Sequence, residues 1–299
     1  MESKLKIIVT GGSGFIGSYV VDDLIKAGYD VSVLDIKKDF VNNSATYYLA
    51  DITDVSVINE LFSKIKPDFC IHLAGILGTS ETWEYPNETV RVNIQGANNV
   101  YDACGRNNCN IITVDVGSRW LSPYTISKTC SADFALGYAN KYNVKCGLLR
   151  IFNVYGPRQS TKIIKIAPMF IYKSLQDEVL EVLGNKKLDL IYVSDVSQAF
   201  CKSIKHIDQI NKRRDVYIGS GNQLLTSEFA EMVINKLGKG AINIIKPRLG
   251  EEDIDSGFMS NNISQQLLDW APSVQLEDGI HLTVEYYKQT DIQTNFGKF

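Results

Sequence analysis

The sequence lacks the clusters that mark metal, redox, membrane and nucleic-acid-binding proteins. Its six cysteines include no C-x-x-C pair and its three histidines show no metal-ligand spacing, so reduced, mostly buried cysteines are expected. No apolar run approaches membrane-spanning length, and a strand expected from residue 5 leaves no room for a signal peptide. The net charge of −3, without a long run of lysine or arginine, argues against nucleic acid. We therefore expect a cytoplasmic protein whose partner is a small molecule.

The first forty residues carry the most informative motif. An apolar, β-prone run over residues 6–10 leads directly into Gly11-Gly12-Ser13-Gly14-Phe15-Ile16-Gly17, and a helical pattern follows. Three spaced glycines let the chain turn sharply, let backbone N–H groups approach a pyrophosphate, and let the helix pack on the strand. The phosphates then lie at the positive end of that helix. The motif predicts a dinucleotide site with contacts from Gly11, Gly14, Phe15, Ile16 and Gly17.

Asp35 distinguishes between the two common dinucleotides. It ends a second apolar run and lies eighteen residues beyond Gly17, where the ribose hydroxyls of NAD need an acceptor. A carboxylate repels the 2′-phosphate of NADP, so Asp35 favours NAD, although Lys37 and Lys38 weaken this preference. NAD is therefore the expected cofactor.

Strand and helix patterns alternate along the first half of the chain. With 299 residues, 44% of them hydrophobic, the chain is large enough for one large core or two packed domains. Strands are expected over 5–10, 30–35, 46–49, 68–73, 109–115 and 144–151, and helices over 15–27, 54–65, 85–107 and 122–142. This alternation predicts an α/β fold with a doubly wound parallel sheet of the Rossmann type, which binds ligands at the carboxyl ends of its strands.

The pattern becomes less regular after residue 158, which predicts a smaller, discontinuous C-terminal substrate domain. A helix is expected over 163–176, strands over 178–183 and 188–193, and helices over 195–206, 226–238 and 276–288. We assign residues 1–160, with about 188–212 and 276–289, to the NAD-binding domain. Residues 161–187 and 213–275 form the expected substrate domain, and residues 290–299 a polar tail.

Tyr124 and Lys128 are the candidates for acid–base catalysis. They lie four residues apart at the start of an expected helix, so both side chains project from one face, a turn apart. A phenol of pKa about 10 is a poor base at neutral pH, but a nearby ammonium group and the positive nicotinamide ring lower that pKa. Tyr124 is then able to take a proton from a sugar hydroxyl while hydride leaves the same carbon.

Together, the glycine loop and the Tyr-Lys pair resemble the extended short-chain dehydrogenase/reductase family, in particular its nucleotide-sugar epimerase and dehydratase branch. The resemblance continues through Asp51-Ile52, His72-Leu73-Ala74-Gly75, Val92-Asn93-Ile94-Gln95-Gly96, and the runs over 149–158, 191–196 and 247–251.

The resemblance implies further contacts and partners. Asp51 and Ile52 would contact the adenine, and Leu73, Ala74 and Gly75 would form a wall beside the nicotinamide. Asn153 and Arg248 would hold the diphosphate of a nucleotide-diphosphate sugar, a task that suits the planar fork of an arginine. The long helices of family members pair in a bundle, which implies a homodimer.

The sequence departs from the family pattern at the end of the fifth expected strand. Family members carry a serine or threonine there, but the alignment without gaps brings Asp115 or Val116 to this place. Asp115 and Ser118 therefore remain candidates for the third catalytic group, and Thr113, deeper in the strand, is a weaker one.

Two further departures concern the substrate pocket. The loop after Val116 is short, so the pocket is expected to be more open, with Trp120 either a lid or a packing anchor. Leu188 stands where relatives often carry a phosphate-binding arginine, and Lys186 or Lys187 is a candidate replacement.

The residues after the fifth strand also bear on the reaction. Dehydratases of this family carry an Asp-Glu pair directly after the catalytic threonine, whereas Asp115 is followed by Val116 and Gly117. Elimination of water therefore lacks its usual acid and base, which leaves hydride transfer at sugar C4. The favoured interpretation is a 4-epimerase, and the close alternative is a 4-dehydrogenase or 4-ketoreductase. A 4,6-dehydratase or a non-catalytic NAD(H)-binding protein is less favoured.

Overall fold

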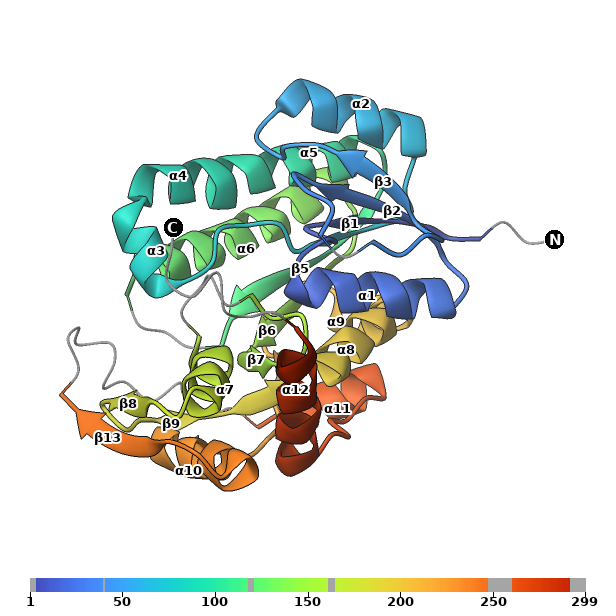
Figure 1. The fold of residues 1–299 in the computed structure, drawn as a ribbon. Helices are drawn as coiled ribbons and strands as arrows, with labels where there is room; N and C mark the ends of the chain where they lie inside the picture. The colour runs from blue at the N-terminus through green and yellow to red at the C-terminus, as the bar shows by residue number, and fades with distance from the viewer. Residues whose placement is uncertain (1–3, 40, 118–120, 161–164, 247–259, 291–299) are drawn as a thin grey trace.

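The computed structural model describes residues 4–39, 41–117, 121–160, 165–246 and 260–290 (Figure 1). Its centre is a seven-stranded parallel sheet in the order β11-β6-β5-β4-β1-β2-β3. The strands are β1 (Lys6–Thr10), β2 (Asp30–Asp35), β3 (Thr46–Leu49), β4 (Phe69–His72), β5 (Asn110–Val116), β6 (Cys146–Ile151) and β11 (Tyr217–Ile218). The strand order reverses between β1 and β4, where doubly wound sheets bind ligands. The predicted α/β Rossmann fold is confirmed.

Alternate strand residues face two different cores, one on each side of the sheet. Ile7 and Val9 pack with α1 (Phe15–Lys26), α8 (Val193–Lys205) and the short helices α9 (Ile207–Ile210) and α11 (Asn262–Leu268). Ile8 faces the opposite way and packs with α2 (Val55–Ile65), α5 (Ala97–Arg106) and α6 (Pro123–Tyr142). Figure 1 shows these two groups of helices on opposite sides of the sheet.

A third core forms beside the carboxyl end of the sheet. It joins α7 (Ile166–Leu175), β8 (Val179–Leu183), α10 (Thr226–Leu237) and α12 (Leu276–Gln289). Short strand pairs complete this part: β7 (Asn153–Tyr155) with β10 (Leu190–Tyr192), β9 (Lys187–Leu188) with β12 (Leu224–Leu225), and β13 (Ala241–Ile245) with β8. Because α12 buries Ile280 and Val284 here while Phe15 and Tyr19 of α1 pack against the same core, α12 connects the two parts. The domain boundaries given above stay a prediction.

The structure corrects the long helix expected over 85–107. The chain forms α3 (Thr79–Glu84), α4 (Pro86–Val90), a π-helical turn over Arg91–Gly96 and then α5. A π-turn adds a residue to the helix and so redirects side chains. Here Asn93 is buried, accepts a hydrogen bond from Ile76 N at 2.7 Å and donates one to Ile76 O at 3.0 Å. The irregular turn thus ties the helix to the loop after β4.

The described residues also bear on membrane-spanning helices, metal-ligand clusters and paired cysteines. No helix within the described ranges is both long and apolar enough to cross a bilayer. The same residues contain no group of three metal-ligating side chains. All six cysteines are free, and Cys70, Cys104, Cys109 and Cys146 are fully buried.

Candidate active site

The glycine loop makes contacts that leave no room for side chains. Gly11 has a φ of +71°, and a Cβ there would lie 2.7 Å from the backbone nitrogen of Ala74, just beyond β4. A Cβ on Gly17 would overlap the carbonyl oxygen of Gly11. Gly14 is the N-cap of α1, and neither a side-chain cap nor an acidic residue occupies the first turn. The loop therefore presents uncapped N–H groups between β1 and β4, the arrangement that binds a pyrophosphate.

Ser13 provides an independent test of whether a phosphate fits this loop. Its side chain is fully buried, and its hydroxyl has no hydrogen-bond partner among the residues that the structure describes. An unsatisfied buried hydroxyl costs about 1–3 kcal/mol. A phosphate oxygen in the loop would accept the missing hydrogen bond, so the site fits a dinucleotide.

Asp35 lies at the end of β2 and also supports the loop. Its carboxylate accepts hydrogen bonds from Ser13 N at 3.0 Å and Lys37 N at 3.3 Å. Burial raises its pKa, and these hydrogen bonds oppose the rise. The carboxylate therefore supports the loop, and its oxygens retain lone pairs for the expected hydrogen bond from a ribose hydroxyl.

The two residues expected at the adenine follow β3. Asp51 is exposed and accepts hydrogen bonds from Thr53 N at 2.9 Å and Thr53 Oγ1 at 2.8 Å. Ile52 is buried, and a Cβ on Gly96 would lie 2.7 Å from its side chain. The π-helical turn thus packs directly against Ile52.

The expected nicotinamide wall continues β4 beside β1. Leu73 N donates to Thr10 O at 3.0 Å, and Thr10 Oγ1 lies 2.7 Å from His72 Nδ1. Burial, assisted by the positive charge of Lys128, lowers the pKa of His72 to about 3, so this histidine is neutral. Lys128 Nζ lies 3.7 Å from the place that a Cβ on Gly75 would occupy. The ammonium group therefore faces the wall and not solvent.

A capping box fixes the start of α6 and with it the Tyr-Lys pair. Ser122 Oγ accepts from Thr125 N at 3.2 Å, and Thr125 Oγ1 accepts from Ser122 N at 3.0 Å. Tyr124 is half-buried in the first turn, and Lys128, one turn later, is 4% exposed. Burial lowers the pKa of Lys128 to about 8, whereas burial and the nearby Asp115 raise the pKa of Tyr124 to about 12. The free phenol is therefore protonated at neutral pH.

Asp115 is engaged in a buried ion pair. Arg150, its register partner on β6, donates to Oδ2 through Nε at 3.0 Å and Nη2 at 2.9 Å. Oδ1 accepts from Val116 N at 2.8 Å and from Thr129 Oγ1 at 3.1 Å. With both oxygens occupied, the carboxylate links β5, β6 and α6, which is the structural role that an acid tied to local donors would have. Ser118 and Trp120 lie outside the described residues.

The expected substrate residues are only partly covered by the structure. Asn153 is half-buried at the start of β7 and donates from Nδ2 to Asp189 O at 3.3 Å. Arg248 lies outside the described residues. Leu188 is buried, Lys187 is exposed and Lys186 is half-buried. Of the two lysines, Lys186 acts through its charge on Lys165. Lys165 in turn lies beside the Tyr124 ring.

Two charged residues escaped the sequence analysis: Lys165, which lies beside Tyr124, and Glu81, which acts on Lys165. Lys165 immediately precedes α7, and its ammonium lies 5.7 Å from the centre of the Tyr124 ring. Glu81 is buried on α3, and its negative charge acts on Lys165. Neither residue belongs to a sequence motif. Only the fold brings α3 and the start of α7 close to α6, so the sequence contained no signal for these two residues.

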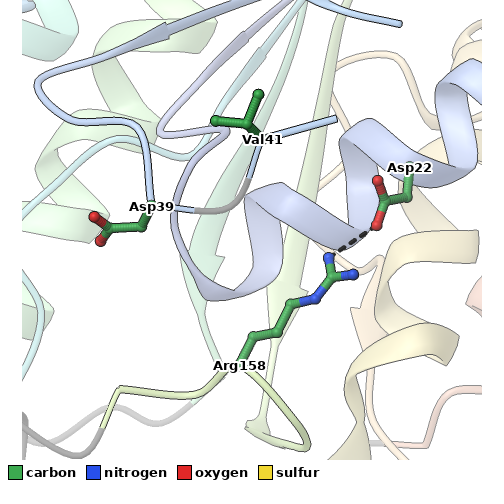
Figure 2. A pocket seen from close by; sticks show the side chains of 4 residues that line it. All are labelled: Asp22, Asp39, Val41 and Arg158. Carbon is green, nitrogen blue, oxygen red and sulfur yellow. Dashed lines mark hydrogen bonds and ion pairs between the residues drawn. The ribbon is translucent and has the colours of Figure 1, made fainter. Parts of the chain in front are cut away.

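A separate surface pocket lies at the flank of α1. Asp22, Asp39, Val41 and Arg158 line it (Figure 2). Arg158 donates to Asp22 Oδ2 at 2.8 Å and stacks over Tyr19, 4.7 Å from the ring centre. These contacts account for Arg158 structurally, and the pocket contains no candidate catalytic side chain.

Comparison with known sequences identifies relatives along nearly the whole chain. A provisionally named UDP-glucose 4-epimerase of Methanocaldococcus jannaschii is 28% identical over 95% of this chain and 99% of its own length. The UDP-N-acetyl-alpha-D-glucosaminuronate decarboxylase of Bacillus cytotoxicus is 26% identical over 96% of this chain and 99% of its own length.

Comparison with solved structures gives the same result. The UDP-glucose 4-epimerase of Thermotoga maritima, solved with UDP-glucose, superposes with a TM-score of 0.87 at 28% identity, covering 95% of this chain and 99% of that one. The UDP-glucuronic acid 4-epimerase of Bacillus cereus, solved with UDP-glucuronic acid and NAD, has a TM-score of 0.86 at 25% identity and the same coverage. A family model described as GDP-mannose 4,6-dehydratase matches residues 8–283. The chain therefore belongs to this family, the nucleotide-sugar epimerase and dehydratase branch of the extended short-chain dehydrogenases/reductases.

Proposed function

We propose that this enzyme is an NAD-dependent nucleotide-sugar 4-epimerase. The observation that carries the proposal is the placement of Lys128 Nζ against Gly75, with Tyr124 one turn away and an orphaned Ser13 hydroxyl in the phosphate loop. An arrangement that only bound a dinucleotide would not need a phenol and a desolvated amine at the nicotinamide wall.

The residues of this chain would divide the proton chemistry as follows. Lys128, together with the positive charge of bound NAD, would stabilise Tyr124 as a phenolate. The phenolate takes the proton of the C4 hydroxyl and becomes a neutral phenol. Bound NAD would supply the hydride acceptor and, after the 4-keto sugar has turned, the hydride donor to its other face. Tyr124 then returns the proton to the C4 oxygen, so the cycle consumes no second substrate. Asn153 and Arg248 are the proposed contacts to the diphosphate.

The contacts of Asp115 bear on the choice of reaction. Its carboxylate is paired with Arg150, and the next residue is Val116, so β5 offers no free acid–base pair for removing water. This supports a reaction that needs only hydride transfer at C4 over a 4,6-dehydratase, which must also remove water. A one-way 4-dehydrogenase or 4-ketoreductase remains the alternative, and a non-catalytic NAD(H)-binding protein is the least favoured. Release of NADH in proportion to product would distinguish a dehydrogenase from an epimerase.

The test is the substitution Tyr124→Phe in the NAD-loaded enzyme. Turnover of a panel of nucleotide sugars, followed by sugar NMR, should fall by about 100-fold or more because the proton acceptor is lost. NAD affinity should stay near the wild-type value, and Tyr48→Phe, on the distant β3, should leave turnover unchanged. Undiminished turnover in Tyr124→Phe would remove the proposed mechanism.

The proposed assembly is a homodimer, and the proposed compartment is the cytoplasm. The long helix α6 buries one face, while Ile126 and Phe134 on its other face are 53% and 41% exposed. The cytoplasmic location rests on the sequence analysis alone and stays a prediction.

A further inference from the structure

We infer that Lys165 binds a carboxylate on the sugar, so that the preferred substrate is a nucleotide uronate and not a neutral nucleotide hexose. The inference rests on the proposed function, because it assumes that C4 of the sugar lies at Tyr124.

Lys165 is a half-buried ammonium group beside the proposed catalytic phenol. Its Nζ lies 5.7 Å from the centre of the Tyr124 ring. None of the ion pairs formed within the described ranges of the chain includes Lys165. A partly desolvated cation without an ion-pair partner is costly unless an anion joins it.

The surrounding charges leave an excess of positive charge. Lys186 approaches Lys165 from the segment before β9, and Lys128 lies on α6. Glu81 on α3 is the opposing carboxylate near Lys165. Asp115 opposes Lys128, but it is itself paired with Arg150 at 2.9 Å, so this pair adds no net negative charge. Burial and Lys186 lower the pKa of Lys165, and Glu81 opposes this fall, as an added anion would.

The chemistry of a hexose identifies the anion that reaches this place. The carboxylate of a uronate is bonded to C5, the direct neighbour of the reacting C4, whereas the diphosphate is attached to C1 across the ring. A sugar whose C4 hydroxyl meets the Tyr124 phenol thus has its C6 group close to the phenol ring. A neutral hexose has a hydroxymethyl group there, which offers no charge to Lys165.

Two related proteins handle sugars of this class. The Bacillus cereus neighbour was solved with UDP-glucuronic acid, and the Bacillus cytotoxicus relative is named for a glucosaminuronate. These are properties of those proteins. For this chain, the argument depends on Lys165 and its surroundings.

The experiment compares UDP-glucuronic acid with UDP-glucose, which differ at C6. Equilibrium affinities for both are measured by calorimetry on the NAD-loaded wild-type enzyme and on Lys165→Met. The wild type should bind the uronate about 10-fold more tightly or better, and Lys165→Met should lose about 10- to 100-fold for the uronate only. Lys165→Arg should retain the preference. Lys173→Met, later on α7 and ion-paired with Glu181, is the matched control and should change neither affinity.

Several outcomes would overturn the inference. Equal wild-type affinities, no binding of UDP-glucuronic acid, or an equal loss of both ligands in Lys165→Met each contradict it. So would unchanged affinities with a lower kcat for both sugars, since Lys165 would then act on the phenol and not on the substrate. The proposed function fails separately: uronate binding that depends on Lys165 without any turnover would remove the epimerase, whereas turnover of UDP-glucose with equal affinities would remove only the uronate site.

Discussion

Individual side chains of the candidate active site owe their acid–base properties to burial. Tyr124 and Lys128 move in opposite directions, the phenol to a pKa of about 12 and the amine to about 8, because burial disfavours the charged form of each. The sequence predicted that these two residues share a helix face. It contained no measure of their burial and gave no sign that Asp115 would oppose the phenolate, since both depend on neighbours far away in the chain.

The low pKa of His72 predicts how the free energy of unfolding depends on pH. Its pKa is lowered from 6.5 to about 3 in the folded protein, so between these values the unfolded chain binds a proton that the folded chain does not. Its contribution is therefore fully present above pH 6.5 and is lost as the pH falls. At pH 5.5 the loss should reach about 1 kcal/mol relative to neutral pH.

The measurement is urea unfolding at pH 7.5 and pH 5.5, compared between the wild type and His72→Gln. The variant should lose less stability between the two pH values, whereas His281→Gln, at an exposed position, should behave like the wild type. Identical losses in the wild type and His72→Gln would contradict the assignment.

At the scale of elements, Asp115 links β5, β6 and α6 at the position where family members normally carry a serine or threonine. Asp115 and Arg150 are paired across the strands, and Thr129 on α6 donates to the same carboxylate. The sequence left Asp115 open between a catalytic acid and a carboxylate bound by local donors. Its partner, Arg150, lies 35 residues later in the chain, within the run over 149–158 that was quoted only for the family resemblance. The two residues meet because the parallel register of β5 and β6 places them side by side.

Breaking this buried pair should destabilise the fold strongly. Asp115→Asn or Arg150→Met leaves an uncompensated buried group, and each should cost about 3–5 kcal/mol, while the double variant should cost less than the sum. Arg213→Met, which removes the exposed ion pair with Asp215, is the control and should have little effect. Additive losses in the double-mutant cycle, measured by chemical unfolding, would show that the pair is not coupled.

Element boundaries were predicted well where the local pattern was strong. The strands at the sheet centre and the long helix after Ser122 appear where expected, because buried β-branched runs and a capping box are local signals. The helix over 85–107 was wrong in detail. Its π-turn satisfies Asn93 through Ile76, a contact between distant segments that helical periodicity does not contain.

For the whole molecule, the exposed face of α6 predicts association. Ile126, Phe134 and the half-buried Tyr138 lie on one stripe of the helix, and a shallow pocket lined by Phe134, Gly137, Tyr138 and Lys141 marks the same face. Burying such a stripe against a second copy is the family arrangement that the resemblance implied.

Sedimentation should therefore give a species of about twice the 33.4 kDa chain mass. Phe134→Glu should shift it to the monomer, since a charge would be desolvated in the interface, with little change in the stability of the monomer because Phe134 is 41% exposed there. Leu282→Glu, at a similarly exposed position on α12 (48%), is the control and should remain dimeric. A wild-type monomer at micromolar concentration would contradict the prediction.

Information close together along the chain was sufficient for the class of fold and for the cofactor loop. Glycine is needed where a Cβ would overlap backbone atoms, as at Gly11 and Gly17. Alternating strands and helices have few ways to bury their apolar faces, so both the loop and the fold class could be recognised without coordinates. The surroundings of Tyr124 were decided by folding alone. Lys165, just before α7, lies beside the Tyr124 ring, Glu81 on α3 acts on Lys165, and Arg150 on β6 pairs with Asp115. Only the packing of these elements around α6 brings these charges together.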